Sequence, residues 1–170
     1  PGVGKPETDR CARNAGLRKD RFVEGLASGR KGIEGMEKVG VKKLRPGAVL
    51  PSFGSKEAAG ADLYACLEES VAIAPGKTVF IPTGLAMALP MGYVGLVYAR
   101  SGLACKQDLA PANKVGVIDS DYRGEFMIAL HNHGSETRIV TNGDRIAQLV
   151  VTPVIQPVYF ETDTLDETDR

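Results

Sequence analysis

Short apolar and β-branched runs, separated by turn sequences, dominate the chain from Val39 onward. Short runs at this spacing are typical of antiparallel sandwiches and jelly rolls. We therefore predict an all-β fold, a jelly-roll-like barrel or sandwich, with little helix. The turns are marked by glycine, proline and asparagine at Pro75-Gly76, Pro90-Met91-Gly92, His133-Gly134-Ser135 and Asn142-Gly143-Asp144.

The strands themselves follow from the β-prone runs. In the last run, Pro153 and Pro157 cannot donate to a strand ladder, which favours an edge or exchanged strand. Residues 56–69 are rich in alanine, leucine and glutamate, but nearby glycines and short length argue against a helix, so we expect a loop followed by a strand. The predicted strands are residues 79–89, 93–98, 125–132, 137–140 and 146–160.

Residues 1–35 differ from the rest of the chain because glycines and charges of both signs are interspersed. We predict that residues 1–35 form a flexible N-terminal appendage or tag, and that the domain spans residues 36–170, with Met36 as a candidate natural start. A weak amphipathic helix around Phe22, Val23 and Leu26 is the alternative.

Composition narrows the class of protein. Hydrophobic residues make up 43% and charged residues 25% of the 170 residues, as in one ordinary globular domain. No apolar run approaches the roughly 18 residues of a membrane span, so we expect a soluble, cytoplasmic protein without membrane contact. A formal net charge of zero argues against stable nucleic-acid binding, so phosphate groups would need a local site. The three cysteines have no C-x-x-C spacing, which predicts free thiols.

Two blocks combine glycine with polar side chains near strand ends. In Ala59–Tyr64, Asp62 could orient an arginine or bind a metal through water, although a loop aspartate is usually a turn residue. The second block places Arg100, Ser101 and Gly102 after a strand, offering a guanidinium, a hydroxyl and an accessible N–H to one phosphate. Ser101 as a helix cap is the simpler reading, and it is compatible with an anion site.

Two further blocks follow. Asp119 emerges from an apolar run with Tyr122 three residues later, and an aspartate in that position can act as a general base. The alternative is a tight turn in which Arg123 pairs with a carboxylate. In the fourth block, Asp144 and Arg145 are typical of a structural ion pair, whereas Gln148 could project toward a ligand.

In this order and spacing, the four blocks resemble the first four motifs of the trimeric dUTPase family, from about Val41 to Arg170. The resemblance implies a dUTP diphosphatase that cleaves dUTP to dUMP and pyrophosphate with Mg²⁺. Such an enzyme limits uracil incorporation into DNA and supplies dUMP for dTMP synthesis. It also implies a homotrimer with active sites at subunit interfaces and an exchanged C-terminal strand.

Roles for individual residues follow from the same resemblance. Asp119 corresponds to the carboxylate that activates the water attacking the α-phosphorus, and Tyr122 to the ring that packs on deoxyribose and leaves no room for a 2′-hydroxyl. Mg²⁺ would be held by phosphate oxygens and water without a direct protein ligand, with Asp62 supporting the site through Arg100 or metal-bound water. The hairpin at residues 109–118 corresponds to the uracil pocket. The implied substrate-binding residues are Arg100, Ser101, Gly102, Asn113, Gly116, Val117, Ile118, Tyr122, Gln148 and Arg170.

The sequence departs from the family pattern in two places. Ala99 replaces the usual proline before Arg-Ser-Gly, which removes a fixed φ angle. The sequence stops at Thr168-Asp169-Arg170, before the glycine-rich fifth motif that closes over substrate. Either the lid is absent and turnover is impaired, or the protein continues beyond Arg170.

Three rival hypotheses remain. A dCTP deaminase shares the fold but needs a glutamate at the position occupied by Ala129, so deamination is disfavoured. A nucleotide-sensing or protein-binding module would fit loss of the fifth motif, whereas the intact Asp119 argues against it. A zinc site would have to use His131 and His133, which are too few ligands by themselves.

Overall fold

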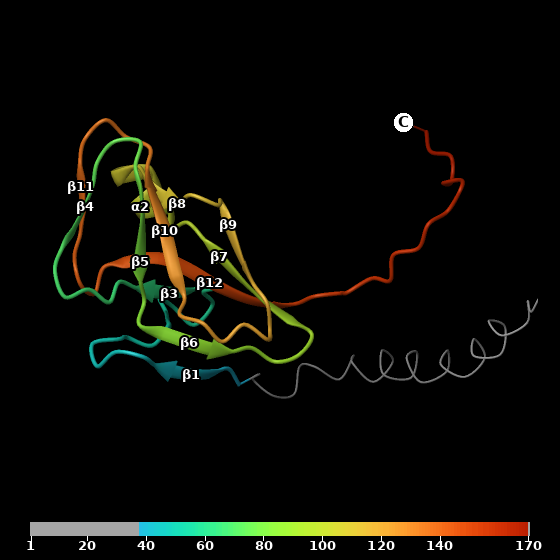
Figure 1. The fold of residues 1–170 in the computed structure, drawn as a ribbon, viewed down its shortest axis with the longest axis horizontal. Helices are drawn as coiled ribbons and strands as arrows, with labels where there is room; N and C mark the ends of the chain where they lie inside the picture. Colours follow the sequence, from blue (N-terminus) through green and yellow to red (C-terminus); the bar gives the residue numbers. More distant parts are fainter. Residues whose placement is uncertain (1–37, 170) are drawn as a thin grey trace, which may run out of the picture. The chain divides into compact units, whose positions relative to one another are not determined.

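The computed structural model describes residues 38–169 (Figure 1). The predicted appendage, Cys11 and Arg170 lie outside these residues. In the described part, strands alternate with short loops and a single seven-residue helix. The elements are β1 (Gly40–Lys43), β2 (Ser52–Phe53), β3 (Ala61–Tyr64), β4 (Val71–Ile73), β5 (Thr78–Pro82), β6 (Leu85–Ala88), β7 (Tyr93–Tyr98), α2 (Ser101–Gln107), β8 (Leu109–Pro111), β9 (Val115–Ile118), β10 (Met127–Asn132), β11 (Arg138–Val140) and β12 (Arg145–Pro153).

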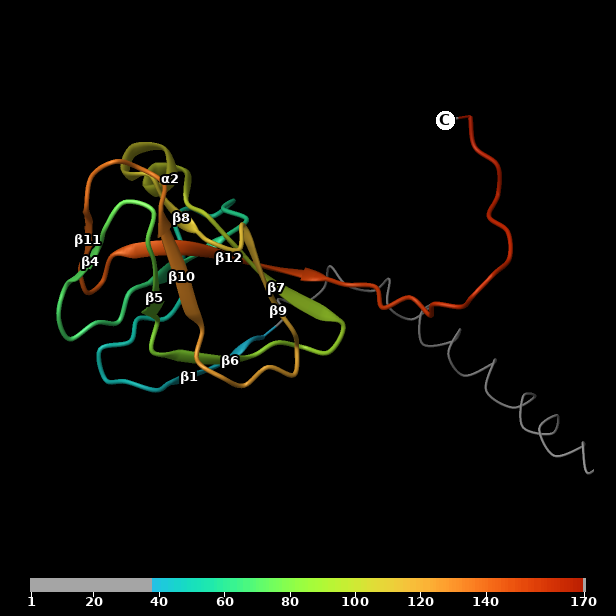
Figure 2. The same ribbon diagram turned by 45° about the horizontal axis from the view of Figure 1, so that its top comes forward.

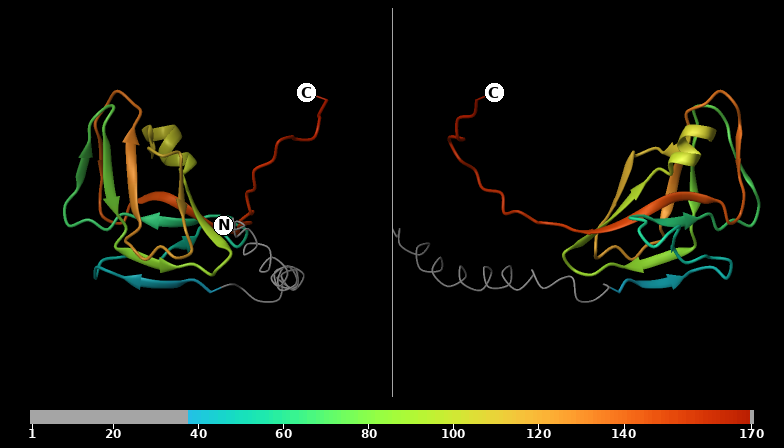
Figure 3. Two further views of the ribbon diagram at one scale, coloured as in Figure 1. Left: turned by 45° about the vertical axis from the view of Figure 1, so that its right-hand side comes forward. Right: turned by 180° about the vertical axis from the view of Figure 1, so that it is seen from behind.

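The strands form several small antiparallel sheets that wrap around one interior (Figures 2 and 3). The largest has the order β2-β3-β12-β7-β9, and the next has the order β5-β10-β8. The pairs β1-β6 and β11-β4 complete the described strands. This architecture confirms the predicted all-β, jelly-roll-like fold.

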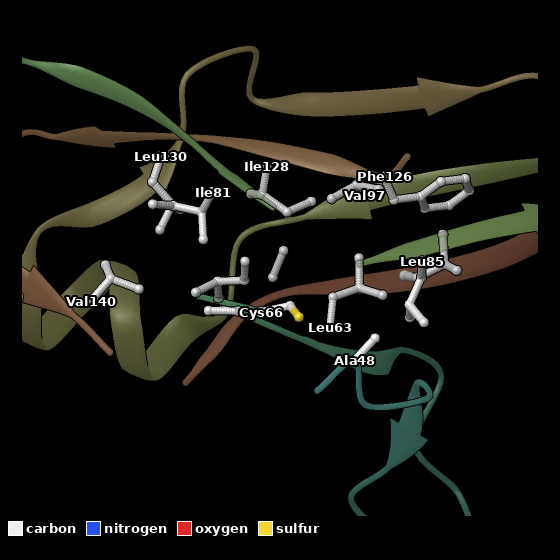
Figure 4. Close-up of a cluster of buried hydrophobic side chains, with 14 of the residues drawn as sticks. Ala48, Leu63, Cys66, Ile81, Leu85, Val97, Phe126, Ile128, Leu130 and Val140 are labelled. Atoms are coloured by element: carbon white, nitrogen blue, oxygen red, sulfur yellow. The ribbon is translucent and has the colours of Figure 1, made fainter. Parts of the chain in front are cut away.

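Alternation along the strands explains how the core forms. In β10, Ile128, Leu130 and Asn132 are buried while the intervening residues are less so, because successive side chains point to opposite faces of a strand. The buried faces meet in one apolar cluster (Figure 4). Each large side chain buried there contributes roughly 1.5–3 kcal/mol of transfer free energy to folding. Members of this cluster include Leu63, Ile81, Leu85, Phe126, Leu130 and Ile146.

Two predicted strands are shorter than expected. Residues 79–89 are divided into β5 and β6 at Thr83 and Gly84, where Gly84 adopts φ +68° and the Thr83 hydroxyl donates to the Phe126 carbonyl at 2.7 Å. The last strand ends at Pro153, and no regular structure follows through residue 169. The predicted loop and strand in residues 56–69 is confirmed by β3, and the predicted strand at residues 93–98 coincides with β7.

The predicted hairpin at residues 109–118 is wrong in one respect. Its arms, β8 and β9, belong to different sheets, because β8 pairs with β10 and β9 pairs with β7. A turn joins them, with the Lys114 N–H donating to the Pro111 carbonyl at 3.1 Å and Lys114 at φ +64°. The segment therefore bridges two sheets and leaves space between them.

Helix α2 begins at Ser101, so Ser101 is its first residue and Arg100 is the N-cap, without a side-chain cap bond. Cys66 and Cys105 are free thiols, as predicted. No helix among the described residues has the length and apolar character needed to cross a membrane.

Candidate active site

A buried carboxylate organises the first group of predicted site residues. Asp62, on β3, is only 8% exposed. Its Oδ1 accepts a hydrogen bond from Arg100 Nε at 2.6 Å, and its Oδ2 lies 3.3 Å from Arg145 Nη1. Two guanidinium groups from the ends of β7 and β12 therefore share one carboxylate, which restricts the orientation of Arg100. Arg145 pairs with Asp62, while Asp144 instead accepts from the Thr141 N–H at 2.7 Å.

Gln148 lies on β12 between the strands that carry these residues. It is in register with Asp62 on β3 and with Tyr98 on β7. Its Nε2 donates to the Ala99 carbonyl at 2.8 Å, so the side chain holds the loop that precedes Arg100. A Cβ at Gly60 would come within 2.8 Å of Gln148 Oε1, which explains why glycine is needed there.

The first turn of α2 completes this group. Ser101 and Gly102 are exposed at the start of the helix, where the first N–H groups have no carbonyl partner within a helix. A cavity of about 230 Å³ lies beside them. Its polar lining comes from Arg100, Gln107, Asp144 and Arg145, so two guanidinium groups, an amide and one carboxylate line the same space.

A second cavity, of about 140 Å³, lies where β9 diverges from β8 and β10. Gly116 keeps the space open, since a Cβ there would lie 3.2 Å from Val97 Cβ and 3.4 Å from Asn113 Nδ2. The volume is sufficient for a small planar ring. Its lining contains Asn113, Gly116, Val117 and Ile118, all predicted from the sequence, together with Phe80, Phe126 and Ala129, which were not.

Asp119 and Tyr122 lie immediately after β9. Asp119 is exposed, and its carbonyl accepts from the Tyr122 N–H at 3.1 Å, so the predicted tight turn is present. Arg123 stabilises that turn by donating to the Ser120 carbonyl at 2.7 Å and the Tyr122 carbonyl at 2.9 Å, not by pairing with a carboxylate. The Tyr122 hydroxyl donates to the Glu125 carbonyl at 3.1 Å, and its ring lies against Phe126.

The two groups of residues lie at opposite ends of β7. Register pairs Ile118 with Gly95, so Asp119 lies near the level of Val94, six residues before Arg100. At about 3.3 Å per residue, this separates the two backbones by on the order of 15–20 Å. One copy of the chain therefore does not bring Asp119 beside Arg100.

The two histidines considered for a zinc site lie outside both groups. His131 and His133 form an edge-to-face ring pair with centroids 4.4 Å apart, and His131 Nδ1 contacts Thr78 Oγ1 at 2.9 Å. Among the described residues, no group of three or more histidine, cysteine or acidic side chains has the arrangement of a metal site.

The fold, the group around Asp62 and Arg100, and the cavity lined by β9 define a class of protein. It is an antiparallel β-domain with a cationic surface organised by a carboxylate and a separate cavity large enough for a small ring. Comparison with known sequences gives the family. The sequence profile described as dUTPase matches residues 47–170, and the chain belongs to the dUTPase family.

Relatives and solved structures agree with that membership. A deoxyuridine 5′-triphosphate nucleotidohydrolase of Syntrophotalea carbinolica is 50% identical over 130 residues, covering 76% of this chain and 88% of the relative. One from Desulfitobacterium hafniense is 55% identical over 122 residues, covering 71% and 81%. The solved dUTPase from phage phi11 of Staphylococcus aureus superposes with a TM-score of 0.71 at 26% identity, covering 78% of this chain and all of that one. Another structure of the phi11 enzyme concerns the coordination of a structural Mg(II) ion.

Proposed function

We propose that this protein hydrolyses dUTP to dUMP and pyrophosphate by attack of an Asp119-activated water on the α-phosphorus. The observation that carries the proposal is the 140 Å³ cavity lined by β9, because Asp119 follows that strand directly and Tyr122 comes three residues later. A cavity for the base, followed along the chain by a carboxylate that could act at the α-phosphorus and a ring that could pack on the sugar, supplies one group for each part of a nucleotide. Family membership supports the same reaction.

The size and lining of this cavity support uracil as the base. The strand β9 presents backbone groups, and Asn113 adds an amide beside Gly116. Backbone donors and acceptors held by strand pairing cannot rearrange, so they discriminate strongly between bases that differ in one edge group. A thymine methyl or a cytosine amino group would therefore reduce binding.

Asp119 is suited to the role of general base because its carboxylate is exposed on a turn that its own carbonyl closes. It would accept a proton from water as that water attacks in line with the departing pyrophosphate. No covalent intermediate with the protein is needed. General-base assistance of this kind typically contributes 10²- to 10⁴-fold in rate.

Charge on the triphosphate would be met by Arg100, Ser101, Gly102 and Gln148. Asp62 accepts from Arg100 Nε at 2.6 Å and from Nη2 at 3.5 Å, and Nη1 lies 3.5 Å from the Arg145 carbonyl. Because each outer nitrogen carries two N–H groups, the held guanidinium still has donors for phosphate oxygens. This arrangement reduces the conformational entropy lost when the arginine binds. Arg170, also proposed to contact substrate, lies outside the described residues.

The donor groups fit Mg²⁺ held chiefly by the substrate. Asp62 is already shared between two guanidinium groups, so its role would be indirect, through water or through Arg100. Mg²⁺ commonly retains several waters and binds through phosphate oxygens with few carboxylates. When bound, it would neutralise charge on the leaving pyrophosphate.

Assembly of the active site would require a neighbouring copy. The separation of Asp119 from Arg100 along β7 supports a site shared between subunits, as proposed for a homotrimer. Residues 154–169 leave the end of β12 and project away from the sheets (Figure 1). Their apolar side chains are exposed, with Ile155 at 87% and Phe160 at 82%, and would be covered by exchange onto a neighbour.

A groove on the domain offers a place for that segment. It has a volume of about 460 Å³ and is lined almost entirely by apolar side chains from β1, β2, β3, β6, β12 and the loops before β2 and β3. The members include Val41, Leu50, Phe53, Met87 and Val151. The C-terminal segment and this groove are both apolar, so the groove of one copy would bury the segment of a neighbouring copy. This supports the proposed strand exchange.

Pyrophosphate release from dUTP, dCTP, dTTP and UTP in the presence of Mg²⁺ tests the reaction. Selective cleavage of dUTP is expected.

Asp119→Asn should reduce kcat by about 10²- to 10⁴-fold while nucleotide binding persists. Asp121→Asn, which alters an exposed carboxylate in the same turn, is the matched control and should retain activity. Selective dUTP binding without turnover in the unaltered chain would favour a binding module.

A further inference from the structure

Glu125 forms a set of contacts that the proposed chemistry does not use. Its Oε1 accepts from the Gly84 N–H at 2.8 Å, and its Oε2 lies 3.4 Å from Arg45 Nη2. The Glu125 side chain is 20% exposed, whereas Gly84 is buried. Glutamate is seldom buried without a partner, so a largely covered carboxylate on a backbone N–H indicates a specific positional role.

The partner of Glu125 is the interruption between β5 and β6. Gly84 has φ +68°, and a Cβ there would come within 2.9 Å of Ala48 Cβ, so this backbone has little freedom to move. Because the strand is interrupted, the Gly84 N–H is satisfied by Glu125 rather than by a ladder carbonyl. Loss of the carboxylate would leave this buried N–H without its acceptor.

Three neighbouring contacts tie the same two segments together. The Phe126 N–H donates to the Leu85 carbonyl at 2.8 Å, and the Thr83 hydroxyl donates to the Phe126 carbonyl at 2.7 Å. The Thr83 N–H donates to that carbonyl at 3.3 Å. Residues 125–126 are therefore hydrogen-bonded to residues 83–85, and Glu125 contributes a side-chain bond to this connection.

The pose of Tyr122 depends on where this fastened segment lies. Its hydroxyl donates to the Glu125 carbonyl at 3.1 Å, and its ring contacts Phe126 with centroids 6.1 Å apart. Gly124 allows the ring to lie over the backbone, since a Cβ there would overlap the Tyr122 ring and hydroxyl. Residues 124–126 therefore position both the hydroxyl and the ring of Tyr122.

We propose that Glu125 is a positioning residue for sugar selection, acting through its bond to the Gly84 N–H to hold the Tyr122 ring where it excludes a 2′-hydroxyl. The inference rests on the proposed role of Tyr122 against deoxyribose. It assigns to Glu125 no contact with substrate. A small displacement of a substrate-positioning group can change rates by up to about 10²-fold, so the indirect role is measurable.

The test compares kcat and KM for dUTP and UTP in four variants. Glu125→Ala should raise KM for dUTP more than it lowers kcat and should reduce the dUTP-to-UTP ratio of kcat/KM by about tenfold. Glu125→Gln should restore the ratio, because the amide oxygen still accepts from Gly84. Arg45→Ala should also retain it, because the Gly84 bond remains.

Thr78→Val controls for general weakening of the same pair of strands. Thr78 contacts His131 at the opposite end of the β5–β10 pairing, so its loss should lower thermal stability without changing sugar selectivity. An unchanged ratio in folded Glu125→Ala, or equal changes in Glu125→Ala and Thr78→Val, would overturn the inference. Absence of dUTP selectivity in the unaltered chain would instead count against the proposed function.

Discussion

At the scale of single residues, the site depends on polar side chains that are partly or wholly removed from water. Asp62 is the clearest case, since a carboxylate with 8% exposure lies between two guanidinium groups. Burial of an ionised group is unfavourable unless it is paired and hydrogen-bonded. The pairing therefore serves stability and the orientation of Arg100 together.

Asp62→Ala should lower the stability of the protein and disturb the orientation of Arg100. Arg100 would remain largely buried without its partner, and we expect the free energy of unfolding to fall by about 1–3 kcal/mol, with KM for dUTP raised about tenfold. Denaturant unfolding and steady-state kinetics measure the two effects. Glu136→Ala removes an exposed ion pair with Arg138 and should change stability by less than about 0.5 kcal/mol. Equal effects of the two variants would contradict this account.

His133 predicts a small pH dependence of stability. Desolvation lowers the pKa of His133, as do the positive charges of His131 and Lys114, whereas Asp108 raises it. The unfolded chain therefore binds this proton more readily, so the contribution is fully present above about pH 6.5 and is lost as pH falls below that value. Because the ring is exposed, water screens these interactions and limits the effect.

Unfolding midpoints measured between pH 7 and pH 5 test this expectation. His133→Gln should lose less stability across that interval than the unaltered chain. Lys114→Ala should show an intermediate slope, because one of the charges that lowers the pKa is removed. Identical slopes in all three proteins would show that His133 does not contribute.

At the scale of elements, the interruption between β5 and β6 is the feature with most consequences. The sequence predicts one strand over residues 79–89, but the interruption divides it into two strands that belong to different sheets. It also leaves the Gly84 N–H free of strand pairing, so that this N–H donates to the Glu125 carboxylate. Similarly, the turn between β8 and β9 sends adjacent strands into separate sheets, and the cavity near Asp119 lies between them. Departures from regular pairing thus create the binding features.

Gly84→Ala should be costly because two effects combine. The backbone at φ +68° disfavours any Cβ, and the new atom would lie 2.9 Å from Ala48 Cβ and 3.0 Å from Cys66 Sγ. We expect a loss of about 2–4 kcal/mol in unfolding free energy. Gly76→Ala is the matched control, with the same φ of +68° but no atom within 4 Å, and should cost about 1 kcal/mol. Similar losses at both positions would show that the close approach is unimportant.

At the scale of the whole molecule, one copy of the chain leaves two features incomplete. The proposed general base and the proposed phosphate-binding arginine lie on the order of 15–20 Å apart along β7. The C-terminal segment exposes apolar side chains that a soluble protein normally covers. Both observations are accounted for by a closed symmetric oligomer in which neighbours share sites and exchange segments.

Removal of the segment after Pro153 should therefore change the oligomeric state. Light scattering at micromolar concentration is expected to give a trimer for the unaltered chain and smaller species for the chain ending at Pro153. The triple change of Ile155, Tyr159 and Phe160 to serine keeps the chain length and should weaken assembly in the same direction. A trimer that persists in both variants would exclude the segment from the interface.

The sequence by itself determined the all-β class and the position of β7, and it named the residues that we propose for the site. These follow from local signals, because strand alternation, turn residues and compact motifs act over a few positions. It did not distinguish β5 from β6, did not identify the separate sheets of β8 and β9, and did not indicate a role for Glu125.

Only the tertiary structure decided which side chains meet. Asp62 and Arg100 are 38 residues apart, and Glu125 and Gly84 are 41 apart, so no local pattern links them. Such partners are selected when strands distant in sequence pair and bury their polar groups, which must then be satisfied by whatever the fold brings near. The motifs supply the chemical groups, and long-range pairing gives them their geometry.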